Sequence, residues 1–366
     1  MLVVAGCGGA SAGSKGSAAG ATIFNVGTNS RIDSLNPFVL TEPEAYAVDD
    51  LVYPQLVSYG GPHGKTIVGD WASSWSDARG GRVWTFHLRP GKWSDGVALT
   101  AADAAWTIET ELHFALGPAA LVAGALTGIS KVSAPDPRTL VITYGTPIGN
   151  VLAELEQVWI LPKHAWISRL GHKGSGLKTY PISERLPMVA GGPYTVTQYN
   201  ETGTTILKRN PYFYGPKPSV SAVALTFYTD SDAMLLALRQ GQIGAIDSVP
   251  FVGLSALRSM AGVHTVTVPG ATVVPLLFNS NPAKRHDREL LSPQVRAALS
   301  MAVNRSALIR VVFDGDAQPW GNWISAYSGR WADPAIGPPT FDPARANAIL
   351  NALGHEILDQ RVAEHL

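Results

Sequence analysis

The sequence predicts a fold that mixes α-helices and β-strands, of the α/β or α+β class. Residues 82–89 alternate apolar and polar side chains with the period of two that is typical of a half-buried strand. Residues 292–315 open with Ser292 as a helix N-cap and Pro293 at the first helical position. Segments of both kinds occur throughout the 366 residues, a length that suits two or three domains.

The first elements follow from apolar runs and the residues that stop them. Residues 21–28 have strand character, and residues 43–60 are expected to be mainly helical. Pro90 and Gly91 stop the strand at 82–89, and a tight turn follows in which Gly96 is free to adopt a positive φ.

A helix should begin after this turn, with Thr100 as N-cap and Asp103 completing a variant of the capping box. Strand, turn and capped helix together account for nearly every residue between 88 and 107. We therefore interpret Trp93 and Asp95 in this stretch as scaffold, and not as parts of a catalytic loop.

The later elements carry the same kinds of signal. In chain order they are a strand at 138–145, a helix-like stretch at 150–166, a β-meander over 191–229, a helix capped by Asp230 or Ser231 that ends at Gly241, a buried apolar strand at 271–279, the helix from Ser292, and a last helix from Asp342 to Gly354.

Composition excludes several classes of function. Lys+Arg and Asp+Glu both number 28, so no surplus of basic residues indicates a nucleic-acid partner. Cys7 is the only cysteine, which rules out a disulfide within the chain and any zinc site with several cysteines. No apolar run approaches the roughly 18 residues of a transmembrane helix.

The N-terminus indicates a lipid anchor. The tetrapeptide Val4-Ala5-Gly6-Cys7 resembles a bacterial lipobox, in which the cysteine carries the lipid, and residues 8–21 read as a flexible tether. A frayed terminus with a chance cysteine is the alternative. Because Met1–Ala5 is too short for a signal peptide and has no Lys or Arg, we expect the natural start to lie upstream.

The sequence does not indicate an enzyme. The G-x-S-x-G match at 9–13 lies in the expected tether, and the near match to a zinc-protease motif at 355–359 has Asp359 where the second histidine must be. The nine histidines show no ligand-like spacing, and there is no P-loop or dinucleotide fingerprint. We expect no catalytic residue, no metal and no cofactor.

Several motifs resemble one family when taken in order. They are DSLNP (33–37), LVYPQLVSYG (51–60), the run from Trp71 to Thr107, ILPKHAW (160–166), GGPYTV (191–196), LKRNPYFYG (207–215), FNSNP (278–282), VRAALSMAVNR (295–305) and FDPARANAILNALG (341–354). The chain thereby resembles the family 5 extracellular solute-binding proteins of ABC importers for oligopeptides, dipeptides and nickel.

The resemblance implies a bilobal fold of the periplasmic-binding-protein type, in its large three-domain type II variant. It places a signal remnant and tether at 1–21, lobe one at 22–42 and 180–270, an inserted domain of that lobe at 43–179, and a partial lobe two at 271–366. After residue 354 the tail departs from the family pattern, so we expect the C-terminal part of the fold to be missing.

The resemblance also implies a function, that of a lipid-anchored, extracytoplasmic protein of the cell envelope. It would act as a monomer, capturing a peptide between its lobes for an ABC permease. Nickel chelates, sugars and opines are alternative ligands, and a truncated remnant with little affinity is the alternative to a working binder. By the resemblance, the ligand-facing positions are Arg31, Ile32, Trp106, Leu277 and Asn279. We expect Arg31 and Trp106 to be partly exposed toward a common groove.

Overall fold

The computed structural model describes residues 2–5, 22–60, 66–114, 126–249, 251–267, 270, 273–325, 332, 333 and 335–355. The chain divides into a first unit of Met1–Val249 with Ala261–Val266, and a second unit of Pro250–Met260 with Thr267–Leu366. The sequence-predicted boundary lay between residues 270 and 271. Residues 6–21, which include Cys7 and the expected tether, lie outside the described residues.

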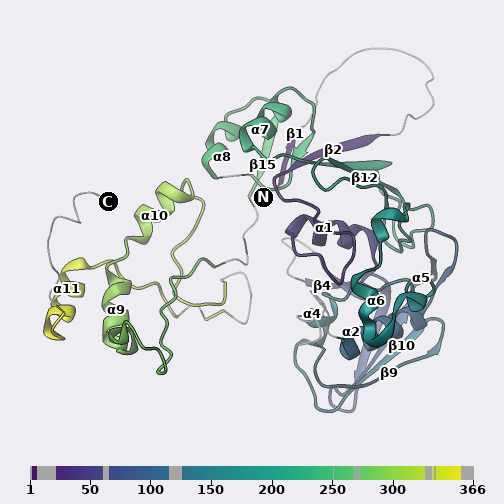
Figure 1. Cartoon of the computed structure of the whole chain (residues 1–366), viewed down its shortest axis with the longest axis horizontal. Coiled ribbons are helices and arrows are strands. Elements are labelled where there is room, and N and C mark those ends of the chain that lie inside the picture. The colour runs from purple at the N-terminus through teal and green to yellow at the C-terminus, as the bar shows by residue number, and fades with distance from the viewer. Residues whose placement is uncertain are drawn as a thin grey trace. The chain divides into compact units, whose positions relative to one another are not determined.

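A seven-stranded sheet forms one layer of the first unit (Figure 1). Its strand order is β11 (Tyr194–Gln198), β12 (Thr204–Arg209), β13 (Ala222–Phe227), β2 (Ile23–Thr28), β14 (Ala245–Ile246), β1 (Leu2–Ala5) and β15 (Val263–Val266). The predicted meander is confirmed as β11, β12 and β13, which pair antiparallel. The central strand β2 is parallel to both β13 and β14.

Strand β1 lies within residues 1–21, where a signal remnant and tether were expected from the sequence, and it pairs antiparallel with β14 and with β15. The run Leu-Val-Val-Ala has the β-branched, apolar character that suits a strand with a neighbour on each side.

A four-stranded antiparallel sheet forms the second layer, in the order β5 (Ala72–Ala78), β6 (Val83–Leu88), β10 (Thr139–Tyr144) and β9 (Ile129–Asp136). All its strands fall within the expected inserted domain. The predicted strands at 82–89 and 138–145 are confirmed as β6 and β10. Two short hairpins accompany this sheet, β3 (Val57–Gly60) with β4 (Thr66–Gly69) and β7 (Gly91–Lys92) with β8 (Ala98–Leu99).

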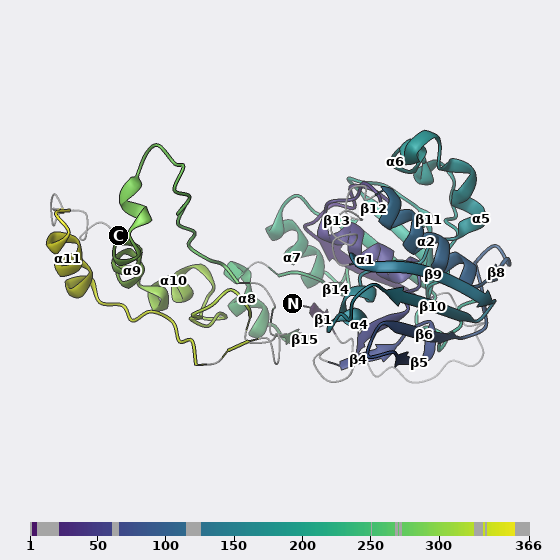
Figure 2. The same ribbon diagram turned by 90° about the horizontal axis from the view of Figure 1, so that it is seen from below.

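Helices cover these sheets in the first unit. They are α1 (Pro43–Val52), α2 (Ala101–Phe114), α4 (Val151–Leu155), α5 (Lys163–Trp166), α6 (Ser175–Lys178) and α7 (Ser231–Arg239), with 3-10 turns at Ile167–Arg169, His172–Gly174 and Ile182–Glu184. Figure 2 shows α2 lying against β9 and β10, which it contacts. Asp230 caps α7 as predicted, because its side chain accepts from the backbone N–H groups of Asp232 and Ala233.

Two helical predictions for the first unit were too long. The stretch 43–60 is helical only to Val52 and then turns into strand β3, since Pro54 cannot continue a helix. The stretch 150–166 forms only the short helices α4 and α5, and Pro162 precedes the second of them.

The core of the first unit is rich in aromatic side chains. Trp71, Trp93 and Trp166 are its largest fully buried residues. The Trp166 ring lies edge-on to Phe38 at 5.4 Å and to Tyr180 at 4.7 Å between ring centroids, a favoured geometry for aromatic pairs. This cluster joins the loop after β2 to α5 and to the segment that leads to β11.

The second unit contains α8 (Phe251–Arg258), a 3-10 turn at Arg288–Leu291, α9 (Pro293–Met301), α10 (Arg305–Val312) and α11 (Pro343–Ala352). The predicted caps are confirmed, since Ser292 accepts from the Val295 N–H and Asp342 from the Arg345 N–H. The helix expected over 292–315 breaks between Met301 and Arg305, where Asn304 caps α10 through the Ala307 N–H.

The predicted buried strand at 271–279 is wrong for its described residues, 273–279, which form neither strand nor helix. Leu276 and Leu277 are 59% and 64% exposed. A strand needs a neighbour to accept its backbone hydrogen bonds, and no described residue of this unit lies in a strand.

The turn and helix at 93–114 agree with their prediction in outline. Gly96 has a φ of +88°, as expected for the turn. The Asp103 carboxylate accepts from the Thr100 N–H at 2.9 Å, from the Thr100 hydroxyl at 3.2 Å, and from the Lys163 N–H at 3.0 Å. Asp103, and not Thr100, is therefore the residue on which the cap depends.

We predict that Asp103→Ala costs about 3 kcal/mol of unfolding free energy, because it leaves two backbone N–H groups unpaired. Thr100→Ala should cost about 1 kcal/mol or less, since it removes one hydroxyl donor. Urea denaturation of both variants tests this, with Asp77→Ala on the exposed edge strand β5 as control. Equal costs for Asp103→Ala and Thr100→Ala would contradict this view of the cap.

Candidate functional site

The candidate site lies where the parallel strands of the large sheet end. In open α/β sheets, ligands bind beyond the carboxyl ends of the parallel strands. Strands β13, β2 and β14 are parallel to one another, and the loop at 29–42 leaves the carboxyl end of β2. Asp33 holds this loop closed, because its carboxylate accepts from the Thr41 N–H at 2.9 Å, the Thr41 hydroxyl at 2.7 Å and the Glu42 N–H at 3.2 Å.

Arg31 is the exposed charged group of this loop. Its guanidinium lies 3.3 Å from the Glu201 carboxylate, on the β11–β12 hairpin, and 3.9 Å from that of Glu42. Its side chain is 47% exposed, so these ion pairs hold the group in place and contribute little to stability. A guanidinium between two carboxylates can exchange one of them for the carboxylate of a ligand.

Ile32, the next residue, is buried and belongs to the core of the first unit. Its backbone carbonyl accepts a hydrogen bond of 2.8 Å from the Tyr199 hydroxyl. Burial, helped by the charges of Glu201 and Asp33, raises the pKa of Tyr199 to about 12. The hydroxyl therefore remains a donor at neutral pH and fixes the loop next to Arg31.

A buried carboxyl group lies behind the loop. Glu44, in the first turn of α1, accepts from the Thr28 hydroxyl at 3.2 Å, and its backbone N–H donates to the Ser30 hydroxyl at 3.4 Å. Burial first, and then a hydrogen bond and charge repulsion from Asp247, raises the pKa of Glu44 to about 8. The Glu44 carboxyl thus carries a proton at neutral pH. Because it is then uncharged, it can lie close to the carboxyl of Asp247 at the ends of β2 and β14.

The expected site residues outside this loop lie on other elements. Trp106 lies on α2 and is only 8% exposed, so the expected partial exposure is found at Arg31 and not at Trp106. The reason is that the Trp106 ring lies in the apolar core between α2 and its neighbours. Leu277 and Asn279 belong to the second unit and are exposed there.

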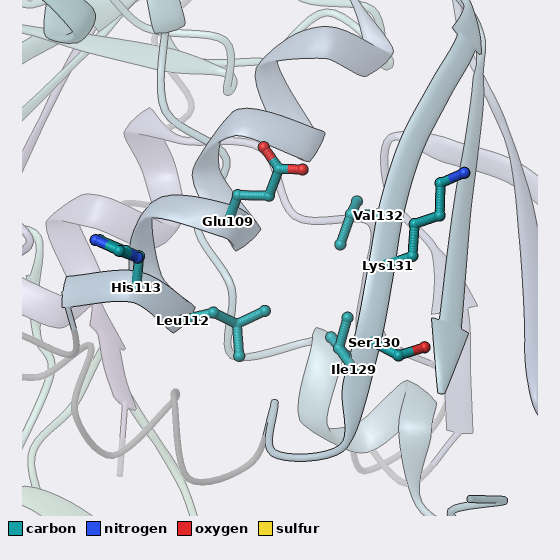
Figure 3. Close-up of a pocket in the computed structure, with 7 residues that line it drawn as sticks. All are labelled: Glu109, Leu112, His113, Ile129, Ser130, Lys131 and Val132. Carbon is teal, nitrogen blue, oxygen red and sulfur yellow. The ribbon is translucent and has the colours of Figure 1, made fainter. Parts of the chain in front are cut away.

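A groove lies elsewhere in the first unit, between α2 and β9 (Figure 3). It has a volume of about 370 Å³ and is lined by Glu109, Leu112, His113, Ile129, Ser130, Lys131 and Val132. Glu109 and Leu112 project from α2 toward β9, whereas the Lys131 amine and the His113 ring point away from the space between them. The groove therefore combines one carboxylate with an apolar floor and brings no nucleophile and base together.

Over the part of the chain that the structure describes, no group of three His, Cys, Asp or Glu side chains could hold a metal ion. Within the same residues, no helix is both long and apolar enough to cross a bilayer.

Sequence reasoning missed Glu44, Asp247 and Glu201. Each is an ordinary acidic residue beside a helix start, a strand end or a turn, and such acids are usually exposed. The one local signal is the position of Glu44 in the first turn of α1. This signal is ambiguous, because an acidic side chain is favourable at the start of any helix. Glu44 follows the loop directly in the sequence, whereas Asp247 and Glu201 come close to it through sheet pairing between segments far apart in the sequence.

Known proteins share both the sequence pattern and the fold. The family profile described as bacterial extracellular solute-binding proteins, family 5 middle, matches residues 66–364. A putative ABC transporter peptide-binding protein of Brucella ovis is 28% identical over 335 residues, which cover 90% of this chain and 60% of that protein. The chain thus spans about 60% of the length of such curated relatives.

The fold resembles that of solved periplasmic binding proteins. One is DppA from Helicobacter pylori in complex with the peptide STSA, with a TM-score of 0.72, 22% identity, and 91% of this chain and 66% of that chain covered. Another is AgaA from A. tumefaciens R10 in complex with agropinic acid, with a TM-score of 0.69, 23% identity, and 91% and 64% covered. This likeness confirms the periplasmic-binding-protein fold expected from the sequence.

We predict that the folded chain becomes less stable as the pH rises. Burial raises the pKa of Glu111 from its usual 4.5 to about 8, and Glu44 shifts in the same direction. A folded state that holds a proton more tightly than the unfolded state is favoured below about pH 4.5, and this advantage is lost as the pH rises through 8. The loss should be roughly 3–5 kcal/mol for fully buried Glu111.

Urea denaturation at pH 5 and pH 8.5 measures this loss, and Glu111→Gln should remove the part of it that Glu111 contributes. Glu109→Gln, at an exposed position on the same helix, is the matched control. An unfolding free energy that changes equally with pH in the wild-type and Glu111→Gln chains would show that Glu111 does not titrate in this way.

Proposed function

The chain belongs to family 5 of the bacterial extracellular solute-binding proteins, and on this premise we propose that it captures a peptide outside the cytoplasm for import by an ABC transporter. The match over residues 66–364 carries this proposal. Relatives such as the Brucella ovis protein are named as peptide-binding proteins of ABC transporters, and not as enzymes. The partner would be the permease complex of such an importer.

Capture of a solute needs no covalent step. It needs a cleft that excludes water, a few fixed polar groups, and two lobes that close on the ligand. The loop after β2 supplies one such polar group, because Arg31 is exposed and held between two carboxylates. A peptide offers a terminal carboxylate that could displace Glu201 or Glu42 from the guanidinium. Ile32, Trp106, Leu277 and Asn279 remain proposed ligand-facing positions on the family resemblance alone.

The proposed ligand class follows from the ligands that are named for the relatives and the solved structures. A peptide is favoured by the Brucella ovis relative and by the Helicobacter pylori complex. Agropinic acid in the A. tumefaciens protein keeps an opine as the alternative, and nickel chelates and sugars are less favoured. A remnant with little affinity is the other alternative.

Location and anchoring belong to the same proposal. A solute-binding protein of this family acts in the cell envelope, outside the cytoplasmic membrane, and we propose that Cys7 carries a lipid that holds it there. The small residues before Cys7 and the Gly/Ser/Ala run after it support this use. One acyl chain binds a bilayer only marginally, so the anchor requires more than one.

We predict that the chain binds peptides and that Arg31→Gln weakens this binding about tenfold, the effect of losing one charge-assisted hydrogen bond. Isothermal titration calorimetry with a peptide mixture and then with single peptides measures the affinity. Arg82→Gln, at an exposed arginine before β6, is the matched control. A folded chain that binds none of these peptides would favour the remnant, and equal affinities for both variants would remove Arg31 from the site.

We predict that Cys7→Ala releases the protein from the membrane fraction, because the thiol that would carry the lipid is gone. The comparison requires expression behind a complete lipoprotein signal peptide, followed by separation of membranes and detection of the protein. Ser11→Ala, in the expected tether, is the control. Equal retention of the wild-type and Cys7→Ala forms would show that the anchor assignment is wrong.

A further inference from the structure

A strongly basic segment of the first unit takes no part in the candidate site. Residues 163–185 contain five Lys or Arg residues and one acidic residue, Glu184. The basic residues are Lys163, Arg169, Lys173, Lys178 and Arg185. The whole chain has 28 Lys+Arg and 28 Asp+Glu. The segment therefore concentrates positive charge that the balanced composition of the chain conceals.

This basic segment is firmly attached to the rest of the first unit. It comprises α5, α6 and three 3-10 turns, and Figure 2 shows α5 and α6 at one edge of the unit. Its apolar side chains Trp166, Leu177 and Ile182 are buried. The Leu177 carbonyl also accepts a hydrogen bond of 2.8 Å from the side-chain amide of Asn36, in the loop after β2. The inner side of the segment is therefore fixed by the core.

The basic side chains of the segment face the solvent. All of them are exposed except Lys163, which is half-buried. Among the described residues, no carboxylate lies within ion-pair distance of any of the five. Asp95, in the turn after β7, pairs with His164 at 2.8 Å instead. The positive charge of the segment is therefore not neutralised within the described part of the chain.

Two of these side chains have a local geometry that indicates a use for their charge. The Arg169 guanidinium lies 5.6 Å from the centroid of the Tyr180 ring, a cation–π contact that positions the side chain without neutralising it. Lys173 has a φ of +53°, in the left-handed region that suits glycine or asparagine better than lysine. A lysine at this position costs backbone strain, and strain of this kind indicates a function for the side chain.

We propose that the basic segment at 163–185 docks on the anionic headgroups of a lipid bilayer. Clusters of roughly four to eight Lys or Arg residues bind such headgroups, and each charge near the surface strengthens binding about fivefold. Ile167 is 45% exposed within the segment and adds an apolar contact at the depth of the headgroups. The docking would hold the first unit against a membrane independently of any lipid on Cys7.

A lipid surface fits this segment better than an acidic protein does. The charges belong to long side chains that emerge from short helices and turns at one edge of the unit, so a flat layer of charge can meet several of them at once. Three of the five are lysines, which act as point charges and impose little geometry on their partner. A protein partner would instead have to match each charge with a carboxylate at a fixed place.

Flotation of the full chain with lipid vesicles tests this docking. The protein carries Cys7→Ala and is expressed without a signal peptide, so no acyl chain contributes to binding. The vesicles contain either phosphatidylcholine alone or an equimolar mixture of phosphatidylcholine and phosphatidylglycerol. We expect binding to the mixed vesicles only, and binding about tenfold or more weaker when the salt concentration rises from about 50 to about 300 mM, because salt screens exposed charges.

A pair of matched double variants locates the surface. Lys173→Gln with Lys178→Gln should weaken binding to the mixed vesicles about 25-fold, which is about fivefold for each charge removed. Lys131→Gln with Lys208→Gln removes the same charge from exposed positions on β9 and β12 and should change binding by less than about twofold. All four lysines are exposed, so neither variant should alter folding, and a thermal melt of each checks this.

Four outcomes would overturn the proposal. They are equal binding to the two kinds of vesicle, no binding to either kind, equal losses in the two double variants, and tighter binding to soluble polyglutamate than to mixed vesicles at equal anionic charge. The last outcome would assign the segment to an acidic protein partner. The assay contains no peptide ligand, so failure of peptide capture and failure of this docking are separately visible.

Discussion

The first unit depends on the close approach of two glycines to the end of α1. The N–H groups of Gly191 and Gly192 donate to the Val52 carbonyl at 3.0 and 2.8 Å. A Cβ at Gly192 would lie 2.6 Å from the Leu51 carbonyl oxygen, and one at Gly191 would lie 2.9 Å from the ring of Trp93. No other residue type fits these positions, because real Cβ atoms do not approach so closely.

This contact connects the start of β11, in the seven-stranded sheet, to the β7–β8 hairpin. The Ala190 carbonyl accepts from the N–H of Ser94, in the turn after β7, and the Asn210 side chain donates to the carbonyls of Ala190 and Gly192 at 3.2 and 2.9 Å. Helix α1 leads out of the loop that contains Arg31, and the glycines lead into β11. The position of the loop that contains Arg31 therefore depends on how closely the two glycines approach the end of α1.

The sequence predicted those features of the fold that depend on a few neighbouring residues. Caps at Ser292 and Asp342 and the turn at Gly96 were predictable, because each depends on a few neighbouring residues. The segment at 273–279 was not, because the same apolar run is a strand only when another strand pairs with it. The contact of Glu44 with Thr28 and the pairing of Arg31 with Glu201 depend on segments 16 and 170 residues apart, which no local pattern reports.

Over the described residues, the second unit buries far fewer apolar side chains than the first, and this difference bears directly on how well a ligand could be held. A binding protein of two lobes holds its ligand only while both lobes have their binding conformation. The apparent dissociation constant equals the intrinsic one divided by the fraction of molecules in that conformation. If the second unit were ordered in about one molecule in ten, affinity would fall about tenfold with every ligand contact in the first unit intact. On the proposed function, order in the second unit would therefore limit affinity as strongly as the charged loop at Arg31.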